Sequence, residues 1–255
     1  MARTIRTNNK QQKNIIKMLD SLTGKYSRWE VWNDFVTMAA VAICNSFWHQ
    51  QWEEREKMYK QCAEKYTDAE IKIFNQMFEE MVTALDDNSE QDFLGELFMA
   101  LEISNEWRGQ FFTLYNICRM TAKINLTEDA KKEIEQKGFA NVNDPACGAG
   151  ALLIAYANAC KVAGINYQQH VFFVAQDVDL LAGMMCYIQL SLLGCPGYVA
   201  VQNTLTNPIE LVDKRGLIPK DSKNVWYTPM FFSDIWADRR QIAFIDSLIG
   251  GEANG

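Results

Sequence analysis

Residues 143–150 read Asn-Asp-Pro-Ala-Cys-Gly-Ala-Gly and stand between a short β-prone run and an amphipathic helix. In an α/β sheet, a strand-to-helix turn of this kind is where ligands bind. Gly148 and Gly150 have no Cβ, so a ligand can lie against their backbone while the helix N-terminus points at it. Asp144 adds a carboxylate, and the lysine of a phosphate-binding loop is missing. The turn therefore predicts a ligand with an ammonium group, although an ordinary tight turn would use the same glycines.

Around this turn, short β-prone runs alternate with helical patterns. The expected strands are Phe139–Asn143, Val171–Ala175, Tyr198–Gln202 and Asn224–Thr228. The expected helices are Ala151–Val162, Asp179–Leu193 and Asp238–Ile249. Alternation of strand and helix requires right-handed crossovers and predicts an α/β fold with a parallel sheet.

A second acidic site follows the next strand, which ends in Gln176-Asp177-Val178-Asp179. An acid at the end of the second strand is typical of sites that bind the hydroxyls of a ribose, because two carboxylate oxygens accept two O–H donors. An aspartate can also cap the helix that follows. We expect Asp177 to bind the ribose and Asp179 to cap the helix.

The first hundred residues predict helices only. Arg28–Trp48 is apolar nearly all round, which indicates a buried helix, and Thr67 with Glu70 forms a capping box that starts a helix at Asp68. Another helix fits Phe93–Ile103. We expect a helical domain over 1–105 and an α/β domain over 106–255. The aromatic side chains expected in the core of the helical domain are Trp32, Phe35, Trp48, Phe74 and Phe78.

Length and composition exclude several classes of protein. With 255 residues, 48% of them apolar and 22% charged, the chain is too long and too apolar for a disordered tail or a disulfide-stapled miniprotein. Seven cysteines without a CxxC pair, and two histidines, do not predict a zinc site. The odd cysteine count without a signal peptide predicts reduced thiols in the cytoplasm. No apolar run is long enough to cross a membrane.

The formal charge of −7 is unevenly distributed. Residues 1–30 carry seven basic and two acidic side chains, whereas residues 53–92 carry five basic and twelve acidic ones. Because salt screens charges more than about 8–10 Å apart, a basic N-terminal arm can bind DNA phosphates in spite of the acidic total. The alternative is an ordinary solvated helix with surface lysines.

Four stretches, in the right order, resemble the adenine-N6 DNA methyltransferases, most closely the modification subunits of type I restriction systems. Residues 144–150 resemble the cofactor motif of that family, and Gly109-Gln110-Phe111-Phe112-Thr113 resembles its Gly-Gln-Phe-aromatic-Thr segment. Gln176-Asp177 matches the acid after the second strand, and Asn203–Pro208 resembles the segment after the third. The resemblance implies a Rossmann-like S-adenosylmethionine-dependent methyltransferase core behind the helical domain.

The resemblance also implies the cofactor and its binding residues. The cofactor is S-adenosylmethionine, with Thr113 near its carboxylate, Asp177 at its ribose and the Asn203 segment at its adenine ring. The residues expected to bind it are Gln110, Phe112, Thr113, Asp144, Ala146, Gly148, Gly150, Asp177 and Asn203.

One part of the family pattern is absent. These enzymes carry an Asn- or Asp-Pro-Pro-aromatic loop after the fourth strand, and the five prolines of this chain include no adjacent pair. The nearest substitute is the segment Tyr227–Phe232, in which Thr228, the Pro229 carbonyl and Phe231 are the candidate catalytic groups. A threonine hydroxyl does not reproduce the planar amide that orients an exocyclic amine. The alternative is that this segment packs into the core.

Only 27 residues follow Thr228, which is too few for the remaining strands of a seven-stranded sheet. We expect an open sheet edge, covered by a protein partner or by a second copy of the chain. Three functions stay open: a cofactor-binding protein of this family that does not methylate DNA alone, an active small adenine-N6 DNA methyltransferase, and a small-molecule methyltransferase.

Overall fold

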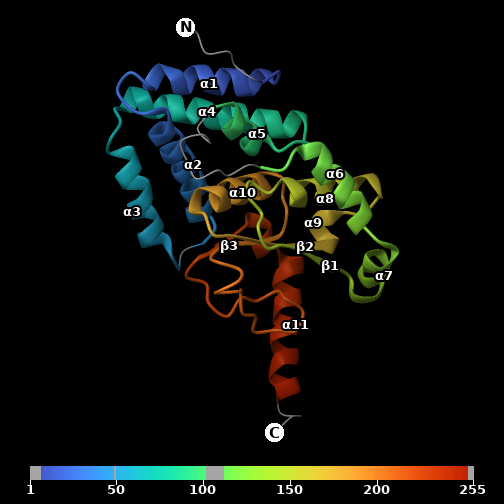
Figure 1. Ribbon diagram of the computed structural model, residues 1–255. Coiled ribbons are helices and arrows are strands. Elements are labelled where there is room, and N and C mark those ends of the chain that lie inside the picture. The colour runs from blue at the N-terminus through green and yellow to red at the C-terminus, as the bar shows by residue number, and fades with distance from the viewer. Residues whose placement is uncertain (1–6, 49, 102–111, 252–255) are drawn as a thin grey trace.

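The computed structural model describes residues 7–48, 50–101 and 112–251, and shows helices stacked above a small sheet (Figure 1). The helices before the sheet are α1 (Lys10–Leu22), α2 (Arg28–Asn45), α3 (Trp52–Ala63), α4 (Asp68–Asp87), α5 (Phe93–Ala100), α6 (Tyr115–Asn125) and α7 (Glu128–Lys137). The remaining elements are β1 (Ala140–Asp144), α8 (Ala151–Val162), α9 (Tyr167–His170), β2 (Val171–Asp177), α10 (Leu180–Leu192), β3 (Gly197–Val201), β4 (Val225–Tyr227), the 3₁₀ helix η2 (Pro229–Phe232) and α11 (Asp234–Gly251).

The N-terminal helices begin where their caps predict. Thr67 Oγ1 accepts a hydrogen bond from Glu70 N, and Glu70 Oε2 accepts one from Thr67 N at 2.8 Å, so α4 starts at the predicted capping box. No strand lies among the described residues up to 101, as expected. Trp32, Phe35 and Phe74 are buried. Trp48 and Phe78 are half-buried and pack against the same core.

The sheet has the order β1-β2-β3-β4, and its first three strands are parallel. The prediction of a fully parallel sheet is wrong for β4, which pairs antiparallel with β3. The reason is the connection: no helix lies between β3 and β4 in the structure, so the chain returns along the neighbouring strand without a crossover. The end of β4 therefore lies at the start of β3, where Tyr227 is opposite Tyr198.

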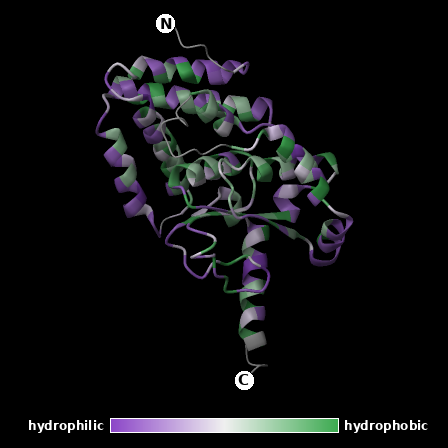
Figure 2. Ribbon diagram, in the orientation of Figure 1, coloured by the Kyte–Doolittle hydropathy of each residue, from purple (hydrophilic) through white to green (hydrophobic). Residues whose placement is uncertain are grey.

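The two faces of the sheet build two apolar cores, because successive side chains of a strand point to opposite faces. Phe173 and Ala175 of β2 face α8, α10 and the helices above them. Phe172 and Val174 face a smaller core with Trp236 of α11. Hydropathy follows this arrangement: α10, next to the sheet, is mostly apolar, and the outer α7 is mostly polar (Figure 2).

A single buried amide joins the N-terminal helices to the turn after β1. Gln189 of α10 is fully buried, and its Nε2 donates to Asp92 Oδ1 and to Ala149 O, both at 2.8 Å. Its Oε1 accepts from Leu94 N at 3.1 Å. The predicted domain boundary at 105 lies outside the described residues. The division into two domains stays a prediction, and one continuous core spans both parts.

Helix α11 begins at Asp234, four residues before the predicted start, and runs away from the body of the protein (Figure 1). Its first turns pack under the sheet through Trp236, and its later turns expose Phe244, Ile245 and Leu248. Among the described helices, none has the length and apolar character needed to span a membrane.

We predict that Gln189→Leu lowers the free energy of unfolding. Leucine fills similar space but leaves Leu94 N–H and Ala149 C=O buried without partners, at about 1–3 kcal/mol for each such group. Chemical denaturation of both proteins measures the difference. Gln76→Leu, at an exposed position of α4, is the matched control and should change stability by less than about 0.5 kcal/mol. Equal stability of Gln189→Leu and wild type would contradict the role given to this amide.

Candidate functional site

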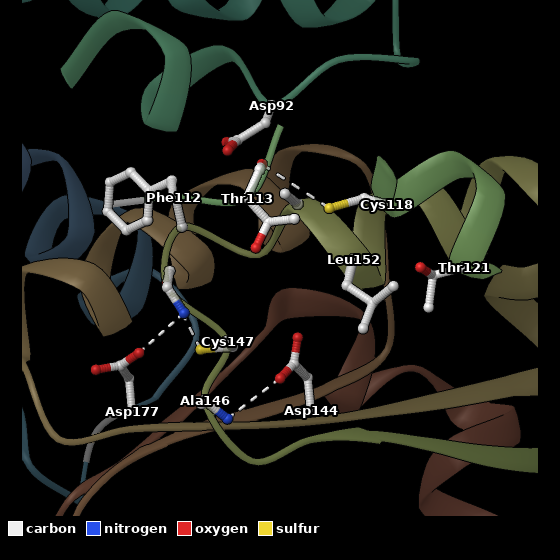
Figure 3. A pocket seen from close by; sticks show the side chains of 13 residues that line it. Asp92, Phe112, Thr113, Cys118, Thr121, Asp144, Ala146, Cys147, Leu152 and Asp177 are labelled. Carbon is white, nitrogen blue, oxygen red and sulfur yellow. Dashed lines mark hydrogen bonds between the residues drawn. The ribbon is translucent and has the colours of Figure 1, made fainter. Parts of the chain in front are cut away.

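A cavity of about 410 Å³ opens at the carboxyl ends of β1 and β2, between the turn after β1 and the start of α6 (Figure 3). Parallel strands with crossover helices leave a ligand crevice at this edge of the sheet. The lining residues are Asp92, Phe112, Thr113, Cys118, Thr121, Asp144, Ala146, Cys147, Gly148, Ala149, Ala151, Leu152 and Asp177.

The turn after β1 is held to β2 by its backbone. Cys147 N donates to Gln176 O at 2.9 Å, and Gly148 N donates to Asp177 Oδ2 at 2.9 Å. Gly148 has φ +53° and Gly150 has φ +95°, a region that other residues adopt only with strain. The glycines predicted to shape this turn are thus required by its backbone, and the turn presents Gly148 to the cavity.

Asp177, the last residue of β2, and Asp179 have different roles, and the role of Asp179 is the predicted one. Asp179 caps α10, because its Oδ1 accepts from Ala182 N at 2.9 Å. Asp177 lines the cavity, and each of its oxygens already accepts one backbone N–H, from Gly148 and from Asp179. A carboxylate has about four acceptor sites, so Asp177 keeps capacity for hydroxyl donors of a ligand.

The cavity wall is acidic. Asp92, Asp144 and Asp177 line it, and among the described residues that line it there is no lysine, arginine or histidine. Burial raises the pKa of Asp144, and the negative charge of Asp177 adds to that shift. Burial also raises the pKa of Asp92. A cationic ligand would lower the free energy of these carboxylates, whereas a phosphate would be repelled.

The wall opposite the glycine turn comes from Asp92, Phe112 and Thr113 (Figure 3). The Phe112 ring lies over Gly148 and also contacts Phe98 of α5, with ring centroids 5.5 Å apart. Sequence reasoning missed Asp92, since its spacing before Gly95 indicates only a helix cap. Its proximity to a turn more than fifty residues later arises from the packing of α5 on α10.

The structure brings together Phe112, Thr113, Asp144, Ala146, Gly148 and Asp177 of the predicted cofactor residues. Gly150 is buried behind the turn at the start of α8 and does not line the cavity. Asn203 does not line it either: its side chain accepts from Leu205 N and Thr206 N. The next residue, Thr204, donates to Pro145 O at 2.6 Å, so this segment adjoins the site. Gln110 lies outside the described residues.

The three candidate catalytic residues lie at the other end of the sheet. Since β4 runs antiparallel, Thr228 follows it at the amino end of β3, where its Oγ1 accepts from Gly197 N at 3.0 Å and donates to Cys195 O at 2.7 Å. Thr228 is fully buried, and Pro229 opens η2 beside it. The Phe231 ring is covered by the Arg240 guanidinium, 3.7 Å from its centroid, and by Tyr227. Thr228 and Phe231 are packed in the core, and Pro229 is half-buried beside them.

All seven cysteines are free and buried. In the parts of the chain that the structure describes, no group of three or more histidine, cysteine, aspartate or glutamate side chains is arranged to hold a metal ion. The polar groups that the described residues bring to the cavity are carboxylates, hydroxyls, backbone amides and the thiols of Cys118 and Cys147.

Comparison with family models agrees with the resemblance seen in the motifs. The family model described as N-6 DNA methylase matches residues 89–243. No curated protein shows a significant match. Among solved structures, the chain is similar to one from Listeria monocytogenes described as a class I S-adenosylmethionine-dependent methyltransferase, with 15% identity and a TM-score of 0.41. That alignment covers 92% of this chain and 79% of the other.

We predict that Gly148→Ala weakens S-adenosylmethionine binding. A Cβ at this position would lie 2.9 Å from Phe112 Cδ1, so the ring that forms the opposite wall must move. Gly164→Ala is the matched control, because Gly164 also has a positive φ but nothing within 4 Å of a new Cβ. Both variants should lose about 1–2 kcal/mol of stability from backbone strain. Only Gly148→Ala should lose affinity in calorimetry, and equal affinities in the two variants would contradict the placement of the ligand.

Proposed function

The chain belongs to the N-6 DNA methylase family, and we propose that it binds the family's cofactor, S-adenosylmethionine, in the cavity at the carboxyl ends of β1 and β2. We further propose that it does not methylate DNA by itself. Cofactor binding is supported best by the charge of the cavity wall, whose described residues include three carboxylates and no basic side chain.

The charge of the wall matches this cofactor better than other nucleoside ligands. S-adenosylmethionine carries a sulfonium and an ammonium against one carboxylate, whereas nucleotides and dinucleotides carry phosphates. Phosphate sites use lysine, arginine or unopposed backbone N–H groups. Here the Gly148 N–H, which would face a phosphate, donates to Asp177 instead.

Each part of the cavity suits one part of the cofactor. Asp177 has acceptor capacity for the ribose hydroxyls, and Gly148 lets the ligand lie against the backbone. Asp144 supplies negative charge at the end of β1, and Thr113 offers a hydroxyl donor to a carboxylate. When bound, the cofactor supplies an electrophilic methyl group on its sulfonium; the residues of this chain bind and orient it.

The absence of DNA methylation by the isolated chain follows from the position of its nearest substitute for the catalytic loop. An adenine methyltransferase needs acceptors for the target amine and an aromatic face for the flipped base, both beside the cofactor. The Thr228 hydroxyl is hydrogen-bonded to the backbone at the amino end of β3. The Phe231 ring is already covered by Arg240. Neither group is available to a base.

A partner would complete such a site. Among the described residues β1 pairs only with β2, so its outer edge is open. We propose that a second protein chain, or another copy of this one, covers that edge, and that DNA phosphates contact the basic N-terminal helix. In support, Lys10 and Lys17 are exposed on α1, and neither forms a salt bridge within the described part of the chain.

We predict binding of S-adenosylmethionine without methyl transfer. Isothermal titration calorimetry of the full chain should show one cofactor bound per chain. A tritiated methyl-transfer assay on DNA of mixed sequence should give no incorporation above background.

Cofactor binding and the lack of methyl transfer would be contradicted by different results. Lack of any calorimetric signal would remove the cofactor assignment. Strong adenine methylation by the purified chain alone, abolished by Thr228→Ala, would show that the segment after β4 is catalytic after all.

We predict that cofactor affinity falls on acidification. The titratable groups on the cavity wall are Asp92, Asp144, Asp177, Cys118 and Cys147. A cationic ligand prefers ionised carboxylates, and burial raises the pKa of Asp92 and of Asp144, so these two bind protons at a higher pH than an ordinary carboxyl, whose pKa is about 4. Calorimetry between pH 8 and pH 5 should show progressive weakening. Constant affinity over this range would mean that these carboxylates do not face the cationic groups of the ligand.

A further inference from the structure

Asp92, between α4 and α5, is a buried acid without a basic partner. Asp92 is 2% exposed, and no lysine, arginine or histidine in the described parts of the chain forms a salt bridge with it. Oδ1 accepts from Gly95 N at 3.0 Å and from Gln189 Nε2 at 2.8 Å. No hydrogen bond to Oδ2 is found among the described residues. Burial without a counter-charge is unfavourable for a carboxylate, so the charge requires an explanation.

Capping of α5 does not explain the charge. Asp92 is the N-cap of this helix, but asparagine and serine cap helices as well as aspartate does and carry no charge into the interior. The hydrogen bond from Gln189 does not require an ionised acceptor either. Both structural roles of Asp92 could thus be filled by a neutral side chain.

The position of Asp92 on the cavity wall would let its negative charge interact with a cationic ligand. The residue lines the cofactor cavity beside Thr113, across from Asp144 and Asp177 (Figure 3). Cys118 also lines this cavity. Burial raises the pKa of its thiol to about 11, and the negative charges of Asp92 and Asp144 add to that increase. Asp92 and Asp144 thus line opposite walls of the cavity, and Asp92 adjoins Thr113, which resembles the family's carboxylate-binding threonine.

We propose that Asp92 binds the α-ammonium group of S-adenosylmethionine together with Asp144, so that the N-terminal helices contribute a cofactor-binding residue. This rests on the proposed function. An ammonium offers three N–H donors, enough for both carboxylates. Gln189 fixes Asp92 through Oδ1. Oδ2 lies against Gly95, accepts no hydrogen bond among the described residues, and is the oxygen proposed to accept from the ligand. The bound cation supplies a counter-charge that the described residues do not provide.

The test compares two ligands on two variants. S-adenosylmethionine carries the amino-acid end, and 5′-methylthioadenosine lacks it. By calorimetry, Asp92→Asn should lower S-adenosylmethionine affinity at least tenfold, as expected for a hydrogen bond to a charged group, and change methylthioadenosine affinity less than twofold. Glu96→Gln is the control, because Glu96 is an exposed acid one turn along α5 that does not line this cavity. Its affinity for both ligands should equal that of wild type.

A thermal melt separates binding from folding. Because burial raises the pKa of Asp92 above its unfolded value, the charged form destabilises the folded protein at neutral pH. Asp92→Asn should therefore melt no lower than wild type without ligand, and S-adenosylmethionine should raise its melting temperature less. A purely structural residue would show the reverse: a lower melting temperature in the variant and equal loss of affinity for both ligands.

The remaining outcomes also decide the matter. Unchanged S-adenosylmethionine affinity in Asp92→Asn would overturn the proposal while leaving the proposed function standing. Failure of wild type to bind S-adenosylmethionine would remove both. If Asp92→Asn does not fold, Asp92→Ser provides a second neutral cap. Failure of both variants to fold would show that the carboxylate itself holds the structure, which contradicts the proposal.

Discussion

The buried amide of Gln189 is the interaction on which the arrangement of the site depends. It lies on α10, the most apolar of the helices next to the sheet, and all three of its hydrogen bonds reach other elements. Two of them go to the start of α5 and one to the glycine turn after β1. A buried polar group must find its partners, so this side chain fixes the N-terminal helices at one position over the turn. The cavity exists because these two parts are held in register.

The sheet separates the cavity proposed to bind the cofactor from the candidate catalytic residues. Its parallel strands, β1 to β3, place Asp144 and Asp177 at one edge, where a cationic cofactor can be bound. After β3 the chain makes no crossover helix, and β4 returns antiparallel. This single change of direction carries Thr228 and Phe231 to the opposite edge, into the core under Trp236 and Arg240. Under the proposed function, the chain thus keeps the cofactor-binding part of a methyltransferase site.

Local signals in the sequence predicted much of this structure. The capping box at Thr67, the apolar periodicity of α8 and α10, and the acid-glycine turn each depend on neighbours within a few residues, and each prediction agrees with the structure. The direction of β4 depends on a connection without periodicity, which no local pattern reveals. Asp92 carries a cap signal only; its place on the cavity wall arises from packing between α5 and α10.

The central claim is that this acidic cavity holds S-adenosylmethionine with its ammonium between Asp92 and Asp144. A crystal structure of the full chain with the cofactor tests it most directly. The account predicts electron density along the turn at Gly148, with the ribose at Asp177 and the ammonium within hydrogen-bond distance of Asp92 Oδ2. Density in any other cavity, or a cofactor in this one with its ammonium pointing away from both carboxylates, would contradict it.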